Sequence, residues 1–144
     1  MRKTVLTGLL VVAGAAALAH SGVQNAAVLA RMDNMKTIGD TMKLLGSMAK
    51  GQTNFQPEVA QAAALQIAKH AGQTPALFEA PETDPKSEAK PAIWENFDDF
   101  SAKSLALETA ALEVAQALSS KDALVPSVQR LGETCKSCHS LYRE

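Results

Sequence analysis

Apolar and small residues recur at alternating steps of four and three along most of this chain, and this spacing places them on one face of an amphipathic helix. The first stripe predicts a helix from about Val23 to Lys50, which Gly51 ends. Its members are Val28, Met32, Met35, Gly39, Met42, Gly46 and Ala49. Gly39 and Gly46 weaken a helix by roughly 1 kcal/mol each relative to Ala. Their presence on the stripe therefore favours another role, the close approach of another backbone or of a flat ligand.

A second helix begins near Pro57, which suits a first-turn position, and it is expected to close at Gly72. The shared face of this helix carries Val59, Ala63 and Ile67. Residues 73–91 then hold four of the six prolines of the chain. Because proline removes a backbone donor and restricts the residue before it, this stretch predicts a long irregular crossover.

The third helix is expected from about Ala92 to Ser119–Lys121, and the fourth follows it with Asp122 as its candidate N-cap. The third stripe is Ile93, Phe97, Phe100, Ser104, Leu107, Ala111, Val114 and Leu118. The fourth stripe is Leu124, Val128, Leu131, Cys135, Cys138 and Tyr142. Four long helices with three connections predict an all-α fold, an antiparallel four-helix bundle.

Composition agrees with one helical domain. The 144 residues are 47% apolar and 20% charged, so the chain can bury a core. Aromatic residues make up only 4%, and runs of β-branched and aromatic residues do not occur, which disfavours an all-β fold. The formal net charge is −1 and the isoelectric point is about 6.3, so no nucleic-acid partner is expected.

The first 19 residues have the order of a secretory signal peptide. Arg2 and Lys3 precede an uncharged run from Val5 to Leu18, and Ala19 completes an A-x-A site with Ala17. The alternative is an uncleaved membrane anchor, although the run is shorter than the roughly 20 apolar residues that span a bilayer. We therefore expect cleavage after residue 19, an exported domain over 20–144 without a membrane segment, and a location in the periplasm.

Both cysteines of the chain lie in Cys135-Lys136-Ser137-Cys138-His139. The C-x-x-C-H pattern is the attachment signature of a c-type haem. Two thiols at this spacing can add to the two vinyl groups on one edge of the macrocycle, and the adjacent imidazole can turn under the iron as its proximal ligand. The motif therefore predicts one covalently bound haem c, with Cys135 and Cys138 as the attachment residues and His139 as the iron ligand.

Other readings of the motif are a redox-active disulfide, a structural disulfide and a zinc site. A thioredoxin-like disulfide needs a βαβ context and a motif at the start of a helix. A structural zinc site needs four ligands, and the remaining histidines are His20, beside the cleavage site, and His70, on another predicted helix. An ordinary structural disulfide has no need of His139.

The sequence resembles the cytochrome c prime family over its whole mature length. The matching residues are the haem motif with Leu141-Tyr142-Arg143 after it, Pro91-Ala92-Ile93-Trp94 with Phe97 and Phe100, Arg31 with Met35, Met42-Lys43, and Ala49-Lys50-Gly51. This resemblance implies a left-twisted four-helix bundle, often a homodimer, with one haem c between the helices.

The family has two branches, which differ at the position of Met35. The resemblance implies that a methionine there ligates the iron in low-spin electron carriers, whereas an apolar cap leaves a five-coordinate iron that binds NO and CO. We expect Met35 to be the distal ligand. The alternative is that Met32, Met35, Met42 and Met48 are flexible fillers of the core.

The resemblance also gives roles to two arginines. It implies that Arg31, one turn before Met35, pairs with a haem propionate; the alternative is a solvated surface side chain. It implies that Arg143 flanks the proximal pocket; the alternative is a favourable cation at a helix C-terminus.

The expected function is that of a periplasmic mono-haem cytochrome that carries single electrons between redox proteins and is not an enzyme. A gas-binding cytochrome and a haem-free helical interaction protein with a disulfide are the alternatives. Lys36, Lys43 and Lys50 recur every seven residues, which indicates a solvated face or a docking patch for an acidic redox partner.

Overall fold

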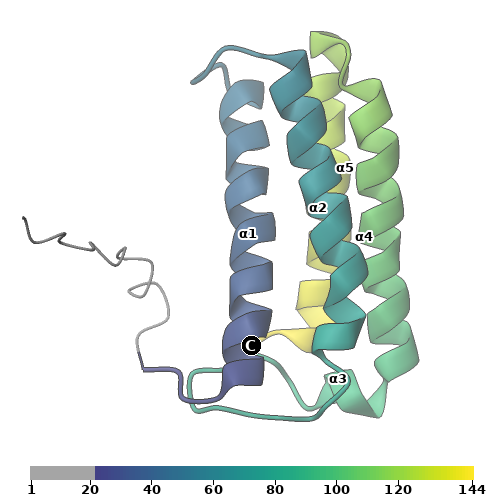
Figure 1. Cartoon of the computed structure of the whole chain (residues 1–144). Coiled ribbons are helices and arrows are strands. Elements are labelled where there is room, and N and C mark those ends of the chain that lie inside the picture. The colour runs from purple at the N-terminus through teal and green to yellow at the C-terminus, as the bar shows by residue number, and fades with distance from the viewer. Residues whose placement is uncertain (1–21) are drawn as a thin grey trace, which may run out of the picture.

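The computed structural model describes residues 22–144, so the predicted signal peptide over residues 1–19 lies outside the described residues. Four long helices form the predicted antiparallel bundle, which Figure 1 shows side by side. They are α1 (Ala26–Ala49), α2 (Pro57–Leu77), α4 (Phe97–Ala117) and α5 (Leu124–Tyr142). Within residues 22–144, none of the helices is both long enough and apolar enough to cross a membrane.

The start of α1 is set by Asn25. Its side-chain oxygen accepts hydrogen bonds from the backbone N–H groups of Ala27 (2.8 Å) and Val28 (3.1 Å), which is the usual N-cap arrangement. The helix therefore begins at Ala26, three residues after the predicted start. It ends at Ala49, before Gly51, whose φ of 70° favours glycine.

α2 does not close at Gly72 as predicted but continues to Leu77, with Pro75 inside its last turn. Proline has no N–H group, so the carbonyl of Ala71 loses its helical partner. The hydroxyl of Ser104 on α4 donates to that carbonyl at 2.8 Å. A contact with another helix therefore compensates for the proline, and the helix extends past it.

The predicted third helix is broken into α3 (Ala92–Glu95) and α4. Asn96 separates them with a non-helical φ of −133° and ψ of 46°. The indole N–H of Trp94 donates to the carbonyl of Phe78 at 2.8 Å, which fastens α3 to the end of α2. The break thus changes the direction of the chain where it enters the bundle.

The predicted N-cap at Asp122 is wrong. A short 3-10 helix, η1 (Lys121–Ala123), precedes α5, and Ser120 caps it by accepting a hydrogen bond from the backbone N–H of Asp122 at 3.3 Å. The serine therefore caps the short helix two residues before Asp122, and the start of α5 has no side-chain cap.

The core consists of two clusters. The larger one fills the bundle between all four long helices, and Leu45, Ile67, Leu118 and Leu131 are among its fully buried members. The smaller one lies at the crossover end and consists of Phe78, Ile93, Phe100 and Tyr142. In the smaller cluster, the ring centroid of Phe100 lies 5.0 Å from that of Phe78 and 5.5 Å from that of Tyr142. These aromatic residues therefore pack together at one end of the bundle.

The crossover between α2 and α3 is fastened to both ends of the chain that the structure describes. The carboxylate of Asp84 accepts from the backbone N–H groups of Gln24 (2.8 Å) and Asn25 (3.1 Å). At the other end, Lys90 N–H donates to the carbonyl of Tyr142 at 3.0 Å, beside a single antiparallel bridge between residues 89 and 143. The crossover therefore lies across the open end of the bundle.

Candidate functional site

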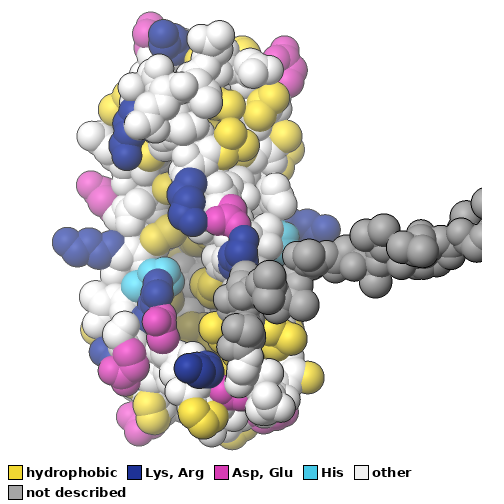
Figure 2. Space-filling view, turned by 90° about the vertical axis from the view of Figure 1, so that its left-hand side faces the viewer, with side chains coloured by type: hydrophobic (Ala, Val, Ile, Leu, Met, Phe, Trp, Pro, Cys, Tyr) yellow, Lys and Arg dark blue, Asp and Glu magenta, His cyan; other side chains and the backbone are white. Residues whose placement is uncertain are grey.

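A cavity of about 610 Å³ opens between α1, α4, α5 and the crossover. This volume is within the roughly 300–1,000 Å³ that is typical of sites for small molecules and cofactors. Figure 2 shows the hollow with an apolar floor and Lys and Arg side chains around it. The candidate residues that line it are Arg31, Met32, Met35, Gly39, Met42, Cys135, Cys138 and His139.

The α5 wall holds the whole C-x-x-C-H motif. Cys135 and Cys138 are half-buried free thiols three residues apart, which places them one above the other on a helix face. Cys135 packs against the larger core cluster and Cys138 against the smaller one. His139 follows directly and also lines the cavity. The sequence pattern therefore brings two sulfur atoms and an imidazole to one wall.

Burial changes the acid–base chemistry of these three groups. It raises the pKa of the Cys135 thiol, and it raises the pKa of the Cys138 thiol against the opposing effect of Lys103. Burial also lowers the pKa of His139, and the nearby charge of Arg143 lowers it further while Glu88 opposes the change. A lowered pKa keeps the imidazole neutral at neutral pH, and the neutral form is the one that binds metals.

The α1 wall carries methionine side chains and open space. Met32, Met35 and Met42 line the cavity, and of these Met35 packs against both core clusters. A Cβ added at Gly39 on α1 or at Gly132 on α5 would meet nothing within 4 Å. Both glycines therefore face the cavity without any close backbone approach, and of the two predicted reasons for Gly39 the room for a flat ligand is the one that fits.

Arg31 lies at the cavity but is not a solvated surface side chain. It is 3% exposed, and its guanidinium donates to the backbone carbonyls of Leu77 and Glu82 (2.8 Å each) and to that of Ala80. The guanidinium carbon lies 4.8 Å from the ring centroid of Phe78. Burial lowers the pKa of Arg31, and Glu82 opposes the shift. Two of the five guanidinium N–H groups lie outside these three hydrogen bonds.

Charged side chains form the rim of the cavity. Asp40 on α1 binds both Lys36 and Lys43, the latter at 2.9 Å, and the hydrogen bonds from these lysines lower the pKa of Asp40 to about 2. Across the opening, Arg143 donates from Nε to the carboxylate of Glu88 at 2.6 Å. Sequence reasoning did not place Glu88 here, because it lies in an irregular segment that has no periodicity.

The other histidine of the described residues lies away from the thiols. His70 on α2 shares a hydrogen bond of 2.7 Å between its Nδ1 and the Oδ1 of Asn34, and Asn34 donates to Thr74 Oγ1 at 3.0 Å. This buried polar group links α1 to α2 and was missed by the sequence analysis. Across residues 22–144, three or more His, Cys, Asp or Glu side chains do not gather as a metal site, which weighs against the zinc reading.

The residues present fit a covalently held haem. Two thiols one helical turn apart match the spacing that attachment requires, and the imidazole beside them is a nitrogen donor suited to iron. The apolar floor and the open space at Gly39 and Gly132 suit a flat, apolar ring.

Known proteins agree with this interpretation. The family model described as Cytochrome C' matches residues 26–143. A cytochrome c-556 of Agrobacterium tumefaciens is 39% identical over 110 residues, which cover 76% of this chain and 89% of the relative. A cytochrome c' of Rhodopseudomonas palustris is 34% identical over 147 residues, which cover 99% of this chain and 96% of the relative.

Solved structures have the same fold. The structure of cytochrome c' from Rhodopseudomonas palustris has a TM-score of 0.78 and 29% identity, and the match covers 84% of this chain and 98% of that chain. A structural model of oxidised cytochrome c556 from the same species has a TM-score of 0.76 and 26% identity, covering 84% and 98%.

Proteins of this type carry one covalently bound haem c per chain, are periplasmic in bacteria, and act as electron carriers or gas binders. The matched region spans all four long helices and the whole C-x-x-C-H motif. By the family model, the sequence identities and the shared fold, this chain belongs to the cytochrome c' family.

Proposed function

We propose that this chain is a periplasmic carrier of single electrons, with its haem c held by Cys135 and Cys138 and its iron ligated by His139 and Met35. The bound haem supplies a reversible one-electron iron couple. The observation that carries the proposal is that all four side chains line one cavity, three from α5 and one from α1. The transfer of single electrons makes and breaks no substrate bond, and we therefore propose no enzymatic activity.

The α5 residues support the attachment by their positions. Cys135 and Cys138 face the same cavity, and each packs against a different core cluster. Thiols fixed at both ends of one helical turn would hold a ring in a single orientation. His139 lies one residue further along α5, so its imidazole would meet the iron from the same wall.

Met35 is supported as the distal ligand by its contacts. It packs against the cluster that adjoins Cys135 and also against the cluster that adjoins Cys138, whereas Met42 packs against the first cluster alone. A soft, neutral thioether sulfur favours Fe(II) over Fe(III) and so raises the reduction potential. A sixth ligand in both oxidation states also limits rearrangement during electron transfer. Without such a ligand, the site would bind a small gas.

The propionate role of Arg31 stays a prediction. Three of its N–H groups are engaged with carbonyls of the last residue of α2 and of the segment after it, and the two that remain outside those bonds could reach a carboxylate in the cavity. A single guanidinium would then serve both the crossover and the cofactor. The possible homodimer also stays a prediction, which sedimentation equilibrium of the purified protein would test.

Visible spectra of the purified protein test the ligation. The wild type should give low-spin spectra in both oxidation states, and its reduced form should bind CO slowly. Met35→Ala should become five-coordinate and bind CO rapidly. Met42→Ala, which removes another cavity methionine, should keep the wild-type spectrum. Rapid CO binding by the wild type at neutral pH would refute Met35 as a ligand and identify a gas-binding member of the family.

Intact mass tests the attachment and the leader together. Protein from the periplasm of a host with a haem-maturation system should have the mass of residues 20–144 plus one haem, which acid-acetone extraction does not remove. A mass of the bare chain less two hydrogens would instead identify the haem-free protein with a Cys135–Cys138 disulfide. A chain that retains residues 1–19 would contradict the predicted cleavage.

A further inference from the structure

We propose that the basic rim of the cavity, defined as Lys36, Lys43, Lys103 and Arg143, is the docking surface for an acidic redox protein. This inference rests on the proposed electron-carrier function, and it names the chemistry of the partner. The four side chains come from α1, α4 and the end of α5, and all four line the opening of the same cavity.

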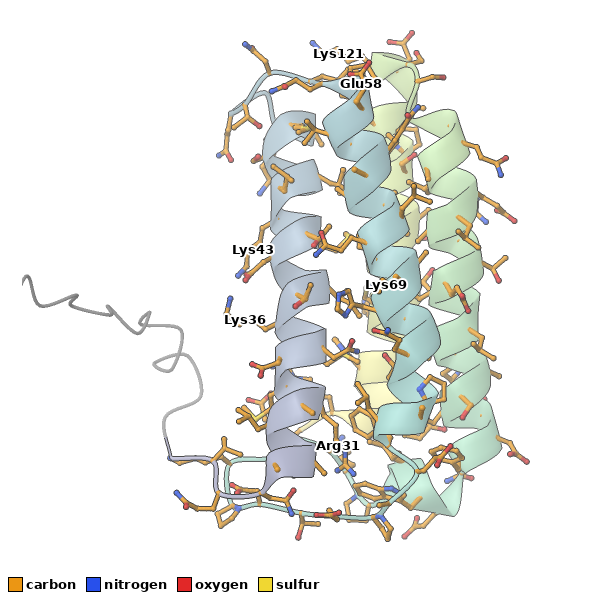
Figure 3. All side chains as sticks on the ribbon, in the orientation of Figure 1. Arg31, Lys36, Lys43, Glu58, Lys69 and Lys121 are labelled. Carbon is orange, nitrogen blue, oxygen red and sulfur yellow. The ribbon has the colours of Figure 1, made fainter. Side chains whose placement is uncertain are left out.

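The α1 part of the rim is a fixed pair of lysines. Lys36 and Lys43 are seven residues apart and therefore lie on one side of the helix. Figure 3 shows both projecting from α1 on the side away from α2, whereas Arg31 turns toward the inside of the bundle. Asp40 lies between them and binds both, so the three side chains keep one net positive charge in a defined position. The side chain of Lys43 is 81% exposed, which leaves it accessible to a partner.

The rest of the rim lies on α4 and at the end of α5. Lys103 is 3.7 Å from Asp99, and Arg143 is paired with Glu88. The charged rim consists of four basic side chains, of which Lys103 is half-buried, and three acidic partners, namely Asp40, Glu88 and Asp99. After these ion pairs, the opening keeps one net positive charge, which comes from the two lysines that share Asp40.

The sign of this charge is opposite to that of the chain. The sequence has 14 basic and 15 acidic residues, and two of the basic ones, Arg2 and Lys3, belong to the predicted leader. Other acidic residues gather in the crossover and the start of α4, outside the cavity lining, namely Glu79, Glu82, Asp84 and Asp98. An uneven distribution of this kind turns a partner during approach and suppresses wrong orientations.

These charges favour a compact acidic protein over other polyanions. A nucleic acid or an anionic membrane presents negative charge over a wide area, and the acidic crossover end would be repelled by it. A partner with one acidic patch would contact only the rim, and it would lie directly over the opening of the cavity. That position shortens the path of the electron between the two proteins.

Small ions of opposite charge provide the test. In a stopped-flow experiment the reduced holoprotein transfers one electron to hexacyanoferrate(III), which becomes hexacyanoferrate(II). Between ionic strengths of about 0.01 M and about 0.15 M the screening length falls from roughly 30 Å to roughly 8 Å. If the rim guides the anion, the rate should fall about threefold to tenfold as salt rises, although the chain is acidic as a whole.

Matched variants separate the rim from the total charge. Lys36→Gln/Lys43→Gln should lose most of the rate at low salt and most of its salt dependence. Lys69→Gln/Lys121→Gln makes the same change in net charge outside the cavity lining and should react nearly as the wild type does. With the cation tris(phenanthroline)cobalt(III) the first variant should react faster than the wild type. A changed driving force would instead slow or speed both oxidants together.

Two results would overturn the docking surface. One is a wild-type rate with hexacyanoferrate(III) that rises with salt, and the other is an equal loss of rate in both double variants. Either result leaves the proposed function intact, because electron transfer itself is still observed. The proposed electron-carrier function is refuted by a different result, a reduced protein that reacts with neither oxidant.

Discussion

Arg31→Met should destabilise the protein by about 2–4 kcal/mol. Hydrogen bonds from a charged donor contribute roughly 1.5–3 kcal/mol each, and Arg31 donates three of them to backbone carbonyls. The buried guanidinium carries a desolvation cost of several kcal/mol, which methionine does not have, so the net loss is smaller than the sum. Of the three carbonyls, those of Ala80 and Glu82 belong to exposed residues and can turn to water, while that of Leu77 is less accessible.

Urea denaturation of the holoprotein, followed by far-ultraviolet circular dichroism, measures this loss. In thermal denaturation, a change of about 3 kcal/mol in the free energy of unfolding corresponds to a fall in Tm of roughly 10 °C for a chain of this size. Arg130→Met is the matched control, since Arg130 pairs with Glu113 at the exposed surface, and such pairs contribute less than about 1 kcal/mol. Hydrogen exchange gives the local signal, because amides in residues 79–90 should exchange faster in Arg31→Met.

The reasoning fails if Arg31→Met costs no more than Arg130→Met, or if exchange in the crossover is unchanged. Such results would mean that the three carbonyl bonds do not hold the crossover in place. Arg31→Lys separates charge from geometry, because lysine keeps the positive charge but cannot donate to three carbonyls as a fork. It should recover only a minor part of the lost stability.

Two further perturbations follow from single contacts. Ser104→Ala leaves the Ala71 carbonyl without its donor and should lower the free energy of unfolding in urea by roughly 1–2 kcal/mol. Adding Pro75→Ala should recover part of this loss by restoring a helical N–H group. Equal losses in the single and double variants would contradict the account. Tyr142 donates to Asp99 at 2.6 Å, and this bond raises the pKa of Tyr142 to about 12. The unfolded chain loses that proton near pH 10, so the stability from this bond should be complete below pH 10 and disappear as the pH rises through 12. A Tyr142→Phe variant with an unchanged stability profile between these values would contradict the assignment.

The long helices could be predicted because their apolar stripes are a direct consequence of packing on one face. The predicted first helix differs from α1 by three residues at its start and by one at its end. The extension of α2 could not be predicted in the same way. It depends on Ser104, which is 33 residues distant from the Ala71 carbonyl that it satisfies, and no local pattern around Pro75 records that partner.

The break at Asn96 was hidden for a different reason. The stripe of Ile93, Phe97 and Phe100 continues across it, because both sides of the break pack into the same cluster. Periodicity reports which residues are buried, and here the burial is continuous although the backbone is not. The contact that identifies the break is the bond from Trp94 to the end of α2.

At the cavity, the sequence identified the side chains on helices and missed those on the crossover. Met35, Cys135 and Cys138 lie on stripes, and a stripe that faces inward brings its members to the same interior space. The partners of Arg31 and Arg143 are carbonyls at the end of α2 and in the irregular crossover, and the crossover carboxylate of Glu88. Their positions follow from the path of the chain between α2 and α3, which the four prolines allow but do not specify.

The position of Met35 depends on hydrogen bonds as much as on apolar packing. Arg31 lies four residues before it and Asn34 directly before it on α1, and both are buried and bonded to α2 or to the segment after it. Hydrogen bonds have direction, so they fix both the rotation and the height of α1, whereas apolar contacts alone would tolerate sliding. Beside the cavity, where apolar packing between α1 and α5 is interrupted, these two polar side chains therefore set the orientation in which the thioether of Met35 enters the site.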